Sequence, residues 1–274
     1  MENAKIGFIG AGNMASSLIQ GLLTKGVSAD AIWAADIDDD KLRELENRCS
    51  IHTGSAKLIT DHVDVIVLAV KPQVMAEACQ ALAADLDGRT PLIVSIAAGI
   101  TIEHLQKWFG ENASLVRCMP NTPALVGKGA SGLFANPRVT DEQKLLAKAI
   151  MQAVGLSVWV ESEADIDAVT AVSGSGPAYF FLFMEAMQDV AIEMGLSKDL
   201  ARDLTYQTAI GAAELAQGSK EDTAELRRRV TSPGGTTEQA IMQFERGGLR
   251  ELVRVALLAA RDRSVAIAEE IASK

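Results

Sequence analysis

The sequence is poor in aromatic residues and in cysteine, and both shortages restrict what the protein can be. Aromatic side chains make up 4% of the 274 residues and hydrophobic residues 48%, so Ala, Leu, Val and Ile must fill most of a folded core. The cysteines are odd in number and widely spaced, which argues against a disulfide framework: Cys49, Cys79 and Cys118. The histidines share no ligand spacing with them or with one another, so we expect no metal site: His52, His62 and His104.

Long apolar runs and an excess of basic residues are also missing. No apolar run reaches the roughly 18 residues that a membrane-spanning helix needs. The chain opens without the hydrophobic segment of a signal peptide, so we expect a cytoplasmic protein with no membrane partner. The net charge of −10 argues against a nucleic-acid partner, because phosphate binding needs concentrated Lys and Arg. We interpret the one compact basic cluster, at 227–229, as a solvated or partner-facing helix end.

Up to residue 162, short apolar runs alternate with amphipathic helical stretches. The runs predict strands at Lys5–Ile9, Ala31–Asp36, Asp64–Val70, Pro91–Ile96, Ser114–Cys118, Ala130–Ala135 and Leu156–Val160. The stretches between them predict helices at Met14–Lys25, Asp39–Arg48, Pro72–Asp85, Ile102–Trp108 and Asp141–Val154. The alternation predicts an α/β fold in which residues 1–162 form a Rossmann-type, doubly wound, mainly parallel sheet.

From residue 163 the strand pattern stops and the sequence predicts helices. They are expected at Pro177–Met194, Lys198–Gln217, Asp222–Val230, Thr237–Arg246 and Leu249–Ala272. We therefore expect an all-helical dimerisation domain over residues 163–274. Its helices are too apolar for about 110 residues to bury alone, so we predict a homodimer or larger homo-oligomer assembled through this domain.

A glycine-rich turn follows the first predicted strand. The pattern G-x-G-x-x-A occurs in Ile9-Gly10-Ala11-Gly12-Asn13-Met14-Ala15. Gly10 permits a tight turn, Gly12 lets backbone N–H groups approach a pyrophosphate, and Ala15 keeps the next helix close to the strand. The helix N-terminus adds free donors and partial positive charge. Because the motif ends a strand and opens a helix, residues 9–14 are predicted to bind a dinucleotide.

Asp36 ends the second predicted strand. A carboxylate there accepts hydrogen bonds from the adenosine ribose hydroxyls and repels a 2′-phosphate. The three aspartates at 38–40 add negative charge or simply start the next helix, while Lys41 and Arg43 offer compensation. The sequence allows NADPH or NADH as cofactor, and the local charge leans to NADH.

Further candidate cofactor contacts follow other predicted strands, because a doubly wound sheet binds ligands at the carboxyl ends of its strands. The segment Ala69-Val70-Lys71-Pro72 directly follows one strand; the alternative is a plain helix start with Pro72 in its first turn and Lys71 exposed. Ala97 and Asn121 occupy similar positions, in segments of small or polar residues that suit a nicotinamide pocket.

Two polar, glycine-containing segments occur in the predicted helical half. Ser175 and Gly176 precede a long apolar helix, where they either form a capped helix start or let backbone approach a small ligand. In the segment 231–239, Thr236 with Gln239 fits a capping box. Gly-Gly in the same turn exposes backbone N–H groups at a helix N-terminus, which suits a carboxylate.

Taken together, these segments resemble the pyrroline-5-carboxylate reductase family over nearly the whole chain. The most specific blocks are Gly7–Met14, Ala69–Pro72, Arg117–Pro123, Asp167–Ala178 and Val230–Thr237. The resemblance implies hydride transfer from NAD(P)H to the C=N carbon of a five-membered cyclic imine, giving L-proline in the last step of proline biosynthesis. It also implies a dimer with intertwined helical domains, often assembled into decamers, with active sites between one subunit's Rossmann domain and its neighbour's helices.

The resemblance further assigns roles to single residues. The substrate carboxylate is expected on the loop residues Ser232, Gly234, Gly235, Thr236 and Thr237, with the Thr237 hydroxyl near the imine nitrogen. Ser175 and Gly176 are expected to border the same pocket. Many relatives have an Asn in contact with the adenosine where this chain has Ala56. An iminium carbon is already a good hydride acceptor, so the absence of an evident catalytic His or Lys is expected.

Two other functions fit parts of the sequence. A β-hydroxyacid or 6-phosphogluconate-type dehydrogenase shares the domain order, but such enzymes usually place a catalytic Lys in the helical half. Here Lys198 and Lys220 lack a glycine-rich context. A non-catalytic nucleotide-sensing protein would explain the glycine turn and the oligomer, but not the polar loop at 231–237.

Overall fold

The computed structural model describes residues 4–272 and divides the chain into two compact units. Residues 1–3 and 273–274 lie outside the described residues; they include the outer ends of the two predicted domains and the start of the N-terminal segment, where no signal peptide is expected. The sheet unit runs up to Ser175 and resumes at Ala259; the helical unit is Gly176–Leu258. A domain boundary after residue 162 stays a prediction.

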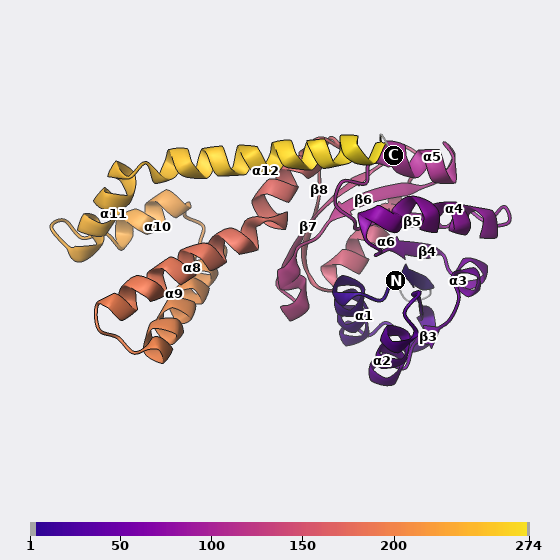
Figure 1. Ribbon diagram of the computed structural model, residues 1–274, viewed down its shortest axis with the longest axis horizontal. Coiled ribbons are helices and arrows are strands. Elements are labelled where there is room, and N and C mark those ends of the chain that lie inside the picture. The colour runs from indigo at the N-terminus through magenta and orange to yellow at the C-terminus, as the bar shows by residue number, and fades with distance from the viewer. Residues whose placement is uncertain (1–3, 273–274) are drawn as a thin grey trace. The chain divides into compact units, whose positions relative to one another are not determined.

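The sheet unit is built on one eight-stranded sheet, with helices on both sides (Figure 1). Its strands are β1 (Ile6–Ile9), β2 (Ile32–Ala35), β3 (His52–Thr53), β4 (Val65–Leu68), β5 (Leu92–Ser95), β6 (Leu115–Met119), β7 (Gly129–Ala135) and β8 (Gly155–Trp159). The order is β3-β2-β1-β4-β5-β6-β7-β8, and every pair is parallel except β6 with β7. The first six strands have the Rossmann order 3-2-1-4-5-6, so the predicted fold class is confirmed.

Twelve α-helices occur within residues 4–272. They are α1 (Asn13–Thr24), α2 (Asp39–Cys49), α3 (Ala56–His62), α4 (Met75–Asp85), α5 (Ile102–Phe109), α6 (Asp141–Gln152), α7 (Asp165–Val169), α8 (Gly176–Glu193), α9 (Lys198–Gly218), α10 (Thr223–Arg229), α11 (Thr236–Arg246) and α12 (Leu249–Ala272). None is both long and apolar enough to cross a membrane. Residues of α12 belong to both units, with the division before Ala259.

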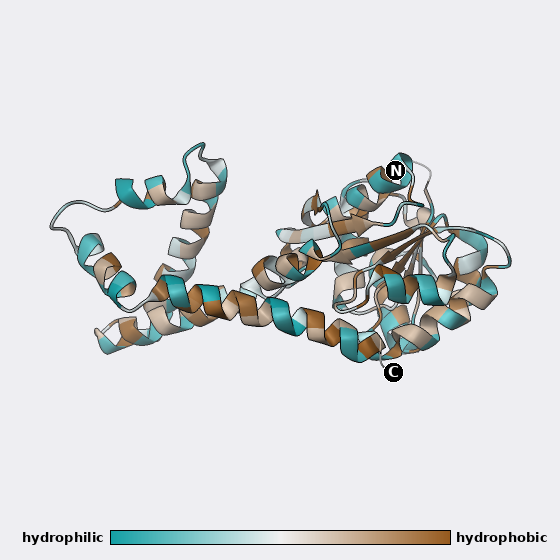
Figure 2. Ribbon diagram, turned by 90° about the horizontal axis from the view of Figure 1, so that it is seen from above, coloured by the Kyte–Doolittle hydropathy of each residue, from teal (hydrophilic) through white to brown (hydrophobic). Residues whose placement is uncertain are grey.

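The core of the sheet unit consists of two apolar layers, one on each face of the sheet. Alternate residues of β4 enter different layers: Val65 and Val67 join one, Ile66 and Leu68 the other. All four are fully buried, which explains why this strand reads as a continuous apolar run. Figure 2 shows the strands of the sheet mostly in the hydrophobic colour.

The segment around Ser173–Pro177 differs from the capped helix start that the sequence allowed. A five-residue π-helical turn, Thr170–Gly174, leads from the end of α7 to the start of α8. The Ser175 N–H donates to the carbonyl of Thr170, five residues back, at 2.8 Å. Pro177, the second residue of α8, has no N–H to give to an earlier carbonyl, and the wider turn accommodates this loss.

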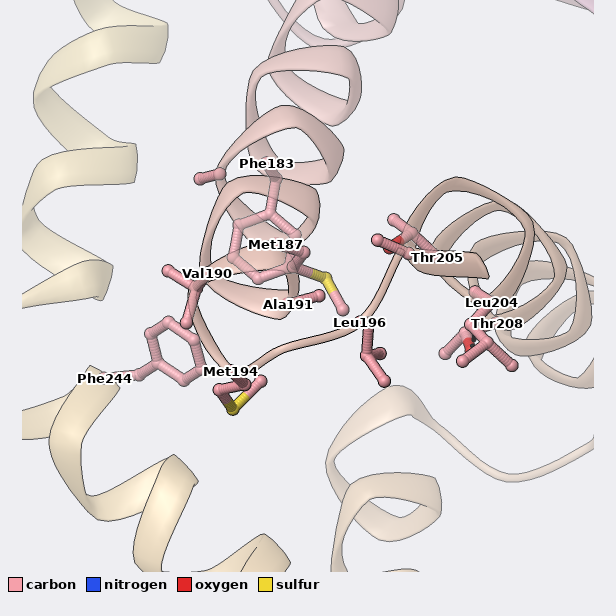
Figure 3. Close-up of a pocket in the computed structure, with 12 residues that line it drawn as sticks. Phe183, Met187, Val190, Ala191, Met194, Leu196, Leu204, Thr205, Thr208 and Phe244 are labelled. Atoms are coloured by element: carbon pink, nitrogen blue, oxygen red, sulfur yellow. Dashed lines mark hydrogen bonds between the residues drawn. The ribbon is translucent and has the colours of Figure 1, made fainter. Parts of the chain in front are cut away.

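The helical unit leaves most of its apolar side chains exposed. Phe180 and Leu182 are each 67% exposed. Phe183, Met187, Val190 and other apolar residues line a hollow of about 440 Å³, shown in Figure 3, where Phe244 of α11 faces α8. The ring centroids of Phe183 and Phe244 lie 5.8 Å apart.

Candidate active site

The turn between β1 and α1 requires glycine at its first position. Gly10 has φ +103°, and a Cβ there would lie 2.7 Å from the carbonyl oxygen of Ala69. A larger residue would force apart the ends of β1 and β4, so this glycine permits their close approach. The Gly10 N–H donates to the carbonyl of Ala35 at 2.7 Å, which also ties the turn to β2.

Gly12 differs from Gly10 because open space lies beside it. It is the N-cap residue of α1, no side chain caps the helix, and a Cβ on Gly12 would meet no described atom within 4 Å. The first N–H groups of α1, from Asn13 and Met14 onward, have no acceptor inside the helix. Behind them Ala15 is fully buried. Free donors beside open space at a helix N-terminus fit a pyrophosphate.

The carboxylate of Asp36 holds the glycine turn in place, a role that the sequence pattern does not predict. Its Oδ2 accepts a hydrogen bond from the Ala11 N–H at 2.7 Å, and its Oδ1 accepts one from the Asp38 N–H at 2.9 Å. Each carboxylate oxygen retains a further lone pair. Asp36 therefore has the capacity to accept a ribose hydroxyl while it holds the turn.

The basic residues near Asp36 pair with acidic neighbours. Lys41 Nζ lies 3.0 Å from Asp38, and Arg43 lies 3.5 Å from Asp40. Asp38 also caps α2 by accepting the N–H groups of Asp40 and Lys41, and its hydrogen bond to Lys41 holds the pKa of its carboxyl below the usual value. The acidic run thus both starts the helix and keeps this edge of the sheet negative.

A mainly apolar hollow of about 370 Å³ opens beside Asp36. Its lining includes Ile9, the last residue of β1. It also includes the exposed Ile37, which follows β2, and Val70, which follows β4. An apolar slot next to a ribose acceptor fits an adenosine. Ala56 also lines the hollow, as the first residue of α3. Its methyl group supplies none of the polar contact that an Asn would give.

The segment after β4 reaches the same edge. The Ala69 N–H donates to the carbonyl of Ile9 at 2.8 Å. Lys71 is exposed and caps a short 3₁₀ turn, Pro72–Val74, which has Pro72 at its start. The helix start that the sequence allowed is therefore present. It leaves the Lys71 ammonium accessible between two residues that line the hollow, Val70 and Val74.

Ala97 lies in the loop after β5, which α12 holds in place. Ala97 is 9% exposed. Gly99 has φ +76°, and a Cβ on it would lie 2.5 Å from the Ile267 side chain of α12. The Ile102 N–H at the end of the loop donates to Glu163 Oε1 at 2.8 Å. The loop is thus held at Gly99 and at Ile102.

A buried ion-pair cluster continues from Glu163. Arg117 of β6, 3% exposed, places Nη1 3.2 Å from Glu163 Oε1 and Nη2 3.2 Å from Asp167 Oδ1. The hydroxyl of Ser264 in α12 donates to Asp167 at 2.8 Å. A guanidinium this buried needs both carboxylates. The one sign of this cluster in the sequence is an arginine inside an otherwise apolar strand, and it does not predict the two partners.

The side chain of Asn121 is committed to protein contacts. Its Nδ2 donates to the Ser173 carbonyl at 2.9 Å, and its Oδ1 accepts the Ala130 N–H at 2.8 Å. In a regular α-helix the Ser173 carbonyl would accept the N–H of residue 177, but Pro177 has none. Asn121 therefore replaces that donor, and a contact to the nicotinamide would fall to its backbone.

The loop Ser232–Gly235 leads into α11 within the helical unit. Gly234 has φ +73°, a conformation that glycine adopts without strain. The expected capping box of Thr236 with Gln239 is wrong: Gly235 is the N-cap residue and no side chain caps the helix. Thr236 is already the first helical residue, so its hydroxyl lies one position too late to cap.

Backbone donors gather on this loop. The Gly234 N–H donates to Glu238 Oε2 at 2.8 Å, and the Gly235 N–H donates to the Ser232 carbonyl at 3.0 Å. The N–H groups of Thr236 and Thr237 open α11 and have no acceptor inside the helix. A loop that already carries one carboxylate oxygen fits the anion site predicted there.

The cysteines of the described residues are buried thiols and do not form an evident catalytic nucleophile. All three cysteines are free and buried, as expected. Burial raises the pKa of the Cys79 thiol to about 12 and raises that of Cys118 as well, so both stay protonated near neutral pH. Within residues 4–272, no three His, Cys, Asp or Glu side chains form a metal-binding group.

The candidate cofactor residues thus gather at the carboxyl edge of β1, β2 and β4, with Ala97 and Asn121 following β5 and β6. The candidate substrate residues 232–237 belong to the helical unit, whereas Ser175 ends one unit and Gly176 begins the other.

Family models match both parts of the chain. Residues 5–99 match a model described as NADP oxidoreductase, coenzyme F420-dependent, and residues 163–267 match one described as pyrroline-5-carboxylate reductase dimerisation. Among solved structures, a pyrroline-5-carboxylate reductase from Coxiella burnetii has TM-score 0.94 and 45% identity, covering 97% of this chain and 99% of that one. The Plasmodium falciparum enzyme, solved with NADP bound, has TM-score 0.85 and 30% identity, covering 98% and 99%.

Curated relatives match this chain along nearly its full length. The pyrroline-5-carboxylate reductase of Pseudomonas aeruginosa is 51% identical over 273 residues, covering 99% of both chains. That of Arabidopsis thaliana is 37% identical, covering 96% of this chain and 95% of the relative. The chain therefore belongs to the pyrroline-5-carboxylate reductase family.

Proposed function

We propose that this protein reduces 1-pyrroline-5-carboxylate to L-proline with NADH or NADPH, the final step of proline biosynthesis. The observation that carries this proposal is the full-length match to reductases of that name. The glycine turn and the Ser232–Thr237 loop supply the two kinds of site that the reaction needs: one for a dinucleotide and one for a small carboxylate.

The sheet unit would hold the dinucleotide. The residues for the pyrophosphate are Gly10, Ala11, Gly12, Asn13 and Met14, and the hollow lined by Ile9, Asp36 and Val70 suits the adenosine. Ala69, Lys71, Pro72, Ala97 and Asn121 would border the remainder. When bound, reduced nicotinamide supplies a hydride to the imine carbon.

We propose that the chain prefers NADH. Asp36 would stand at the ribose position, and the first two cations that follow it in α2 are already paired, Lys41 with Asp38 and Arg43 with Asp40. A 2′-phosphate entering here would meet a net negative surface. The Plasmodium falciparum relative binds NADP, so this preference would be a property of the individual chain.

The helical unit would position the imine. Its carboxylate would take the backbone donors and hydroxyl groups of the loop Ser232, Gly234, Gly235, Thr236 and Thr237, with Ser175 and Gly176 beside it. The Thr237 hydroxyl would face the imine nitrogen and pass it a proton, directly or through water. Since a protonated imine accepts hydride readily, orientation and exclusion of water complete the work of the protein.

The assembly we propose is a homodimer or a higher homo-oligomer, such as a decamer, formed through the helical unit. The family model matched over residues 163–267 is one for dimerisation. The exposed apolar side chains of α8, among them Phe180 and Leu182, give a second chain a surface to cover. We place the protein in the cytoplasm, where its three free cysteines suit the reducing conditions.

The test is an assay of NADH and NADPH oxidation by the purified protein with 1-pyrroline-5-carboxylate, next to a panel of β-hydroxyacids assayed in the oxidative direction with NAD⁺ and NADP⁺. We expect turnover with the imine, formation of L-proline, and a higher kcat/KM for NADH. Turnover with the hydroxyacids alone would reject the proposal in favour of a dehydrogenase. Dinucleotide binding without any turnover would favour a nucleotide sensor.

A further inference from the structure

The loop proposed to bind the substrate carboxylate already carries a carboxylate of the chain itself. Glu238, the third residue of α11, is partly exposed and accepts the Gly234 N–H through Oε2 at 2.8 Å. Gly234 lies in the left-handed region, with φ +73°. This backbone donor is one of those assigned to the substrate, so the Glu238 carboxylate and a bound imine would meet at the same loop.

Two carboxylates next to one donor group oppose each other. They compete for the same hydrogen, and their like charges repel at short range. The internal carboxylate has an advantage, because it is tethered one turn from the loop and loses no translational freedom on binding. A substrate carboxylate must therefore displace Glu238 or bind beside it at a cost.

The structure also provides a place for a displaced Glu238. Its side chain borders a hollow of about 580 Å³ on the same unit, which Arg227 and Arg228 line as well. Arg228 is held closely by Glu225, at 2.6 Å, whereas Arg227 makes only a 3.5 Å contact with Glu245. Arg227 therefore has donor capacity for a second carboxylate.

We propose that Glu238 is an internal competitor for the substrate-carboxylate site and so sets the affinity of this chain for the imine and for proline. The inference rests on the proposed function of the loop. A glutamate in the first turn of a helix also stabilises that turn through the helix dipole, and a purely supporting role of this kind makes the opposite prediction for affinity.

The test compares wild type with Glu238→Gln and Glu238→Ala in the full-length enzyme. If the carboxylate competes, its removal lowers the KM for 1-pyrroline-5-carboxylate about three- to tenfold, the scale of one exposed charge-assisted hydrogen bond. The Ala variant should show the larger change, since Gln still accepts the Gly234 N–H. The KM for NADH and the kcat should stay within about twofold of wild type.

Glu251→Gln is the matched control, because this exposed glutamate of the same unit pairs with Arg254 at 2.7 Å and with no loop donor. It should leave the KM unchanged. Calorimetric titration with L-proline makes the same comparison without turnover, so a failure of the proposed function would be seen separately. A KM for 1-pyrroline-5-carboxylate that is raised or unchanged in both Glu238 variants, with the melting temperature kept, overturns the inference. Equal proline affinity in all four proteins overturns it as well.

Discussion

In the sheet unit, β4 places Val65 and Val67 in one apolar layer and Ile66 and Leu68 in the other, all fully buried, whereas in the helical unit Phe180 and Leu182 are each 67% exposed. One chain thus completes the core of the first unit and leaves that of the second unfinished. The sheet unit therefore buries its core within one chain, whereas the exposed apolar surface of the helical unit agrees with its match to a dimerisation family model.

The largest expected effect is on the self-contained unit. Gly12→Val places a branched side chain in the open space beside the first turn of α1, where a pyrophosphate would lie. We expect loss of measurable NADH binding by calorimetry, with the oligomer intact by light scattering. Gly218→Val is the control, because Gly218 ends α9 with no described atom near its Cβ position. Unchanged NADH affinity in Gly12→Val would remove the pyrophosphate assignment.

A charged side chain on the apolar surface of the helical unit should prevent assembly of the subunits. Phe183→Asp puts a carboxylate into the apolar hollow shared with Phe244, and covering this charge with the apolar surface of a second chain, as proposed for the dimer, would be costly. We expect monomers by sedimentation velocity, no turnover, and NADH affinity within about twofold of wild type. Leu145→Asp, at a 70% exposed apolar position of the sheet unit, should leave the assembly unchanged. A Phe183→Asp variant that remains dimeric would show that assembly does not depend on this apolar hollow.

The chemistry proposed for the helical unit depends on one hydroxyl. Thr237→Ala should lower kcat about ten- to a hundredfold, the scale of one positioned proton-transfer group. NADH binding, which belongs to the other unit, should not change. Thr231→Ala serves as the control, since its hydroxyl already donates to the Arg227 carbonyl at 2.6 Å. Wild-type kinetics in Thr237→Ala would exclude the role.

Sequence patterns predicted most strands of the sheet unit and its glycine turn, because the strands are buried on both faces and the turn needs glycine for steric reasons. The run at 63–70 and the glycines at 10 and 12 are of this kind. The two-residue β3 and seven-residue α3 are too short to show a period, and they were missed. The sequence also did not predict that the Asn121 side chain bonds the Ser173 carbonyl. That carbonyl lacks a helical donor only because residue 177, four positions later, is a proline.

The helical unit was predicted as helices but less well at its loop. Thr236 and Gln239 have capping-box spacing, yet the helix begins at Thr236 and Glu238 bonds the loop instead. Spacing cannot decide between two polar side chains that compete for the same backbone donors. The buried cluster of Arg117 shows the same limit, because its partners lie 46 and 50 residues away in the chain.

The choice between NADH and NADPH depends on the sheet unit, where Asp36 lies beside the proposed ribose site. Asp36→Asn removes the charge opposite a 2′-phosphate while keeping an acceptor for the Ala11 N–H, now bonded at 2.7 Å. We expect the ratio of kcat/KM for NADPH to that for NADH to rise about three- to fivefold, the scale of one screened charge contact. Asp40→Asn, an exposed neighbour, should change the ratio far less. An unaltered ratio in Asp36→Asn would assign the preference elsewhere.

The smallest expected effect is a pH dependence confined to the sheet unit. His104 lies in the first turn of α5, where its Nδ1 accepts the Thr101 N–H at 3.2 Å. Burial lowers the pKa of this imidazole below its usual value, in agreement with a neutral ring that must keep Nδ1 unprotonated. As pH falls below about 6.5, the unfolded chain takes up the proton first. The free energy of unfolding therefore decreases there, and the His104 contribution is fully present only above that pH.

Asn at position 104 keeps an acceptor for Thr101 and cannot titrate, which separates protonation from the loss of the cap. We expect the melting temperature of wild type to fall between about pH 7.5 and about pH 5.5 by a few degrees more than that of His104→Asn. The same difference should appear in a monomeric Phe183→Asp background, because the imidazole and its partner both belong to the unit that one chain completes. If the extra loss of melting temperature vanished in monomers, the effect of His104 protonation would depend on assembly. The stability of the sheet unit would then depend on a second chain, against what its buried core indicates.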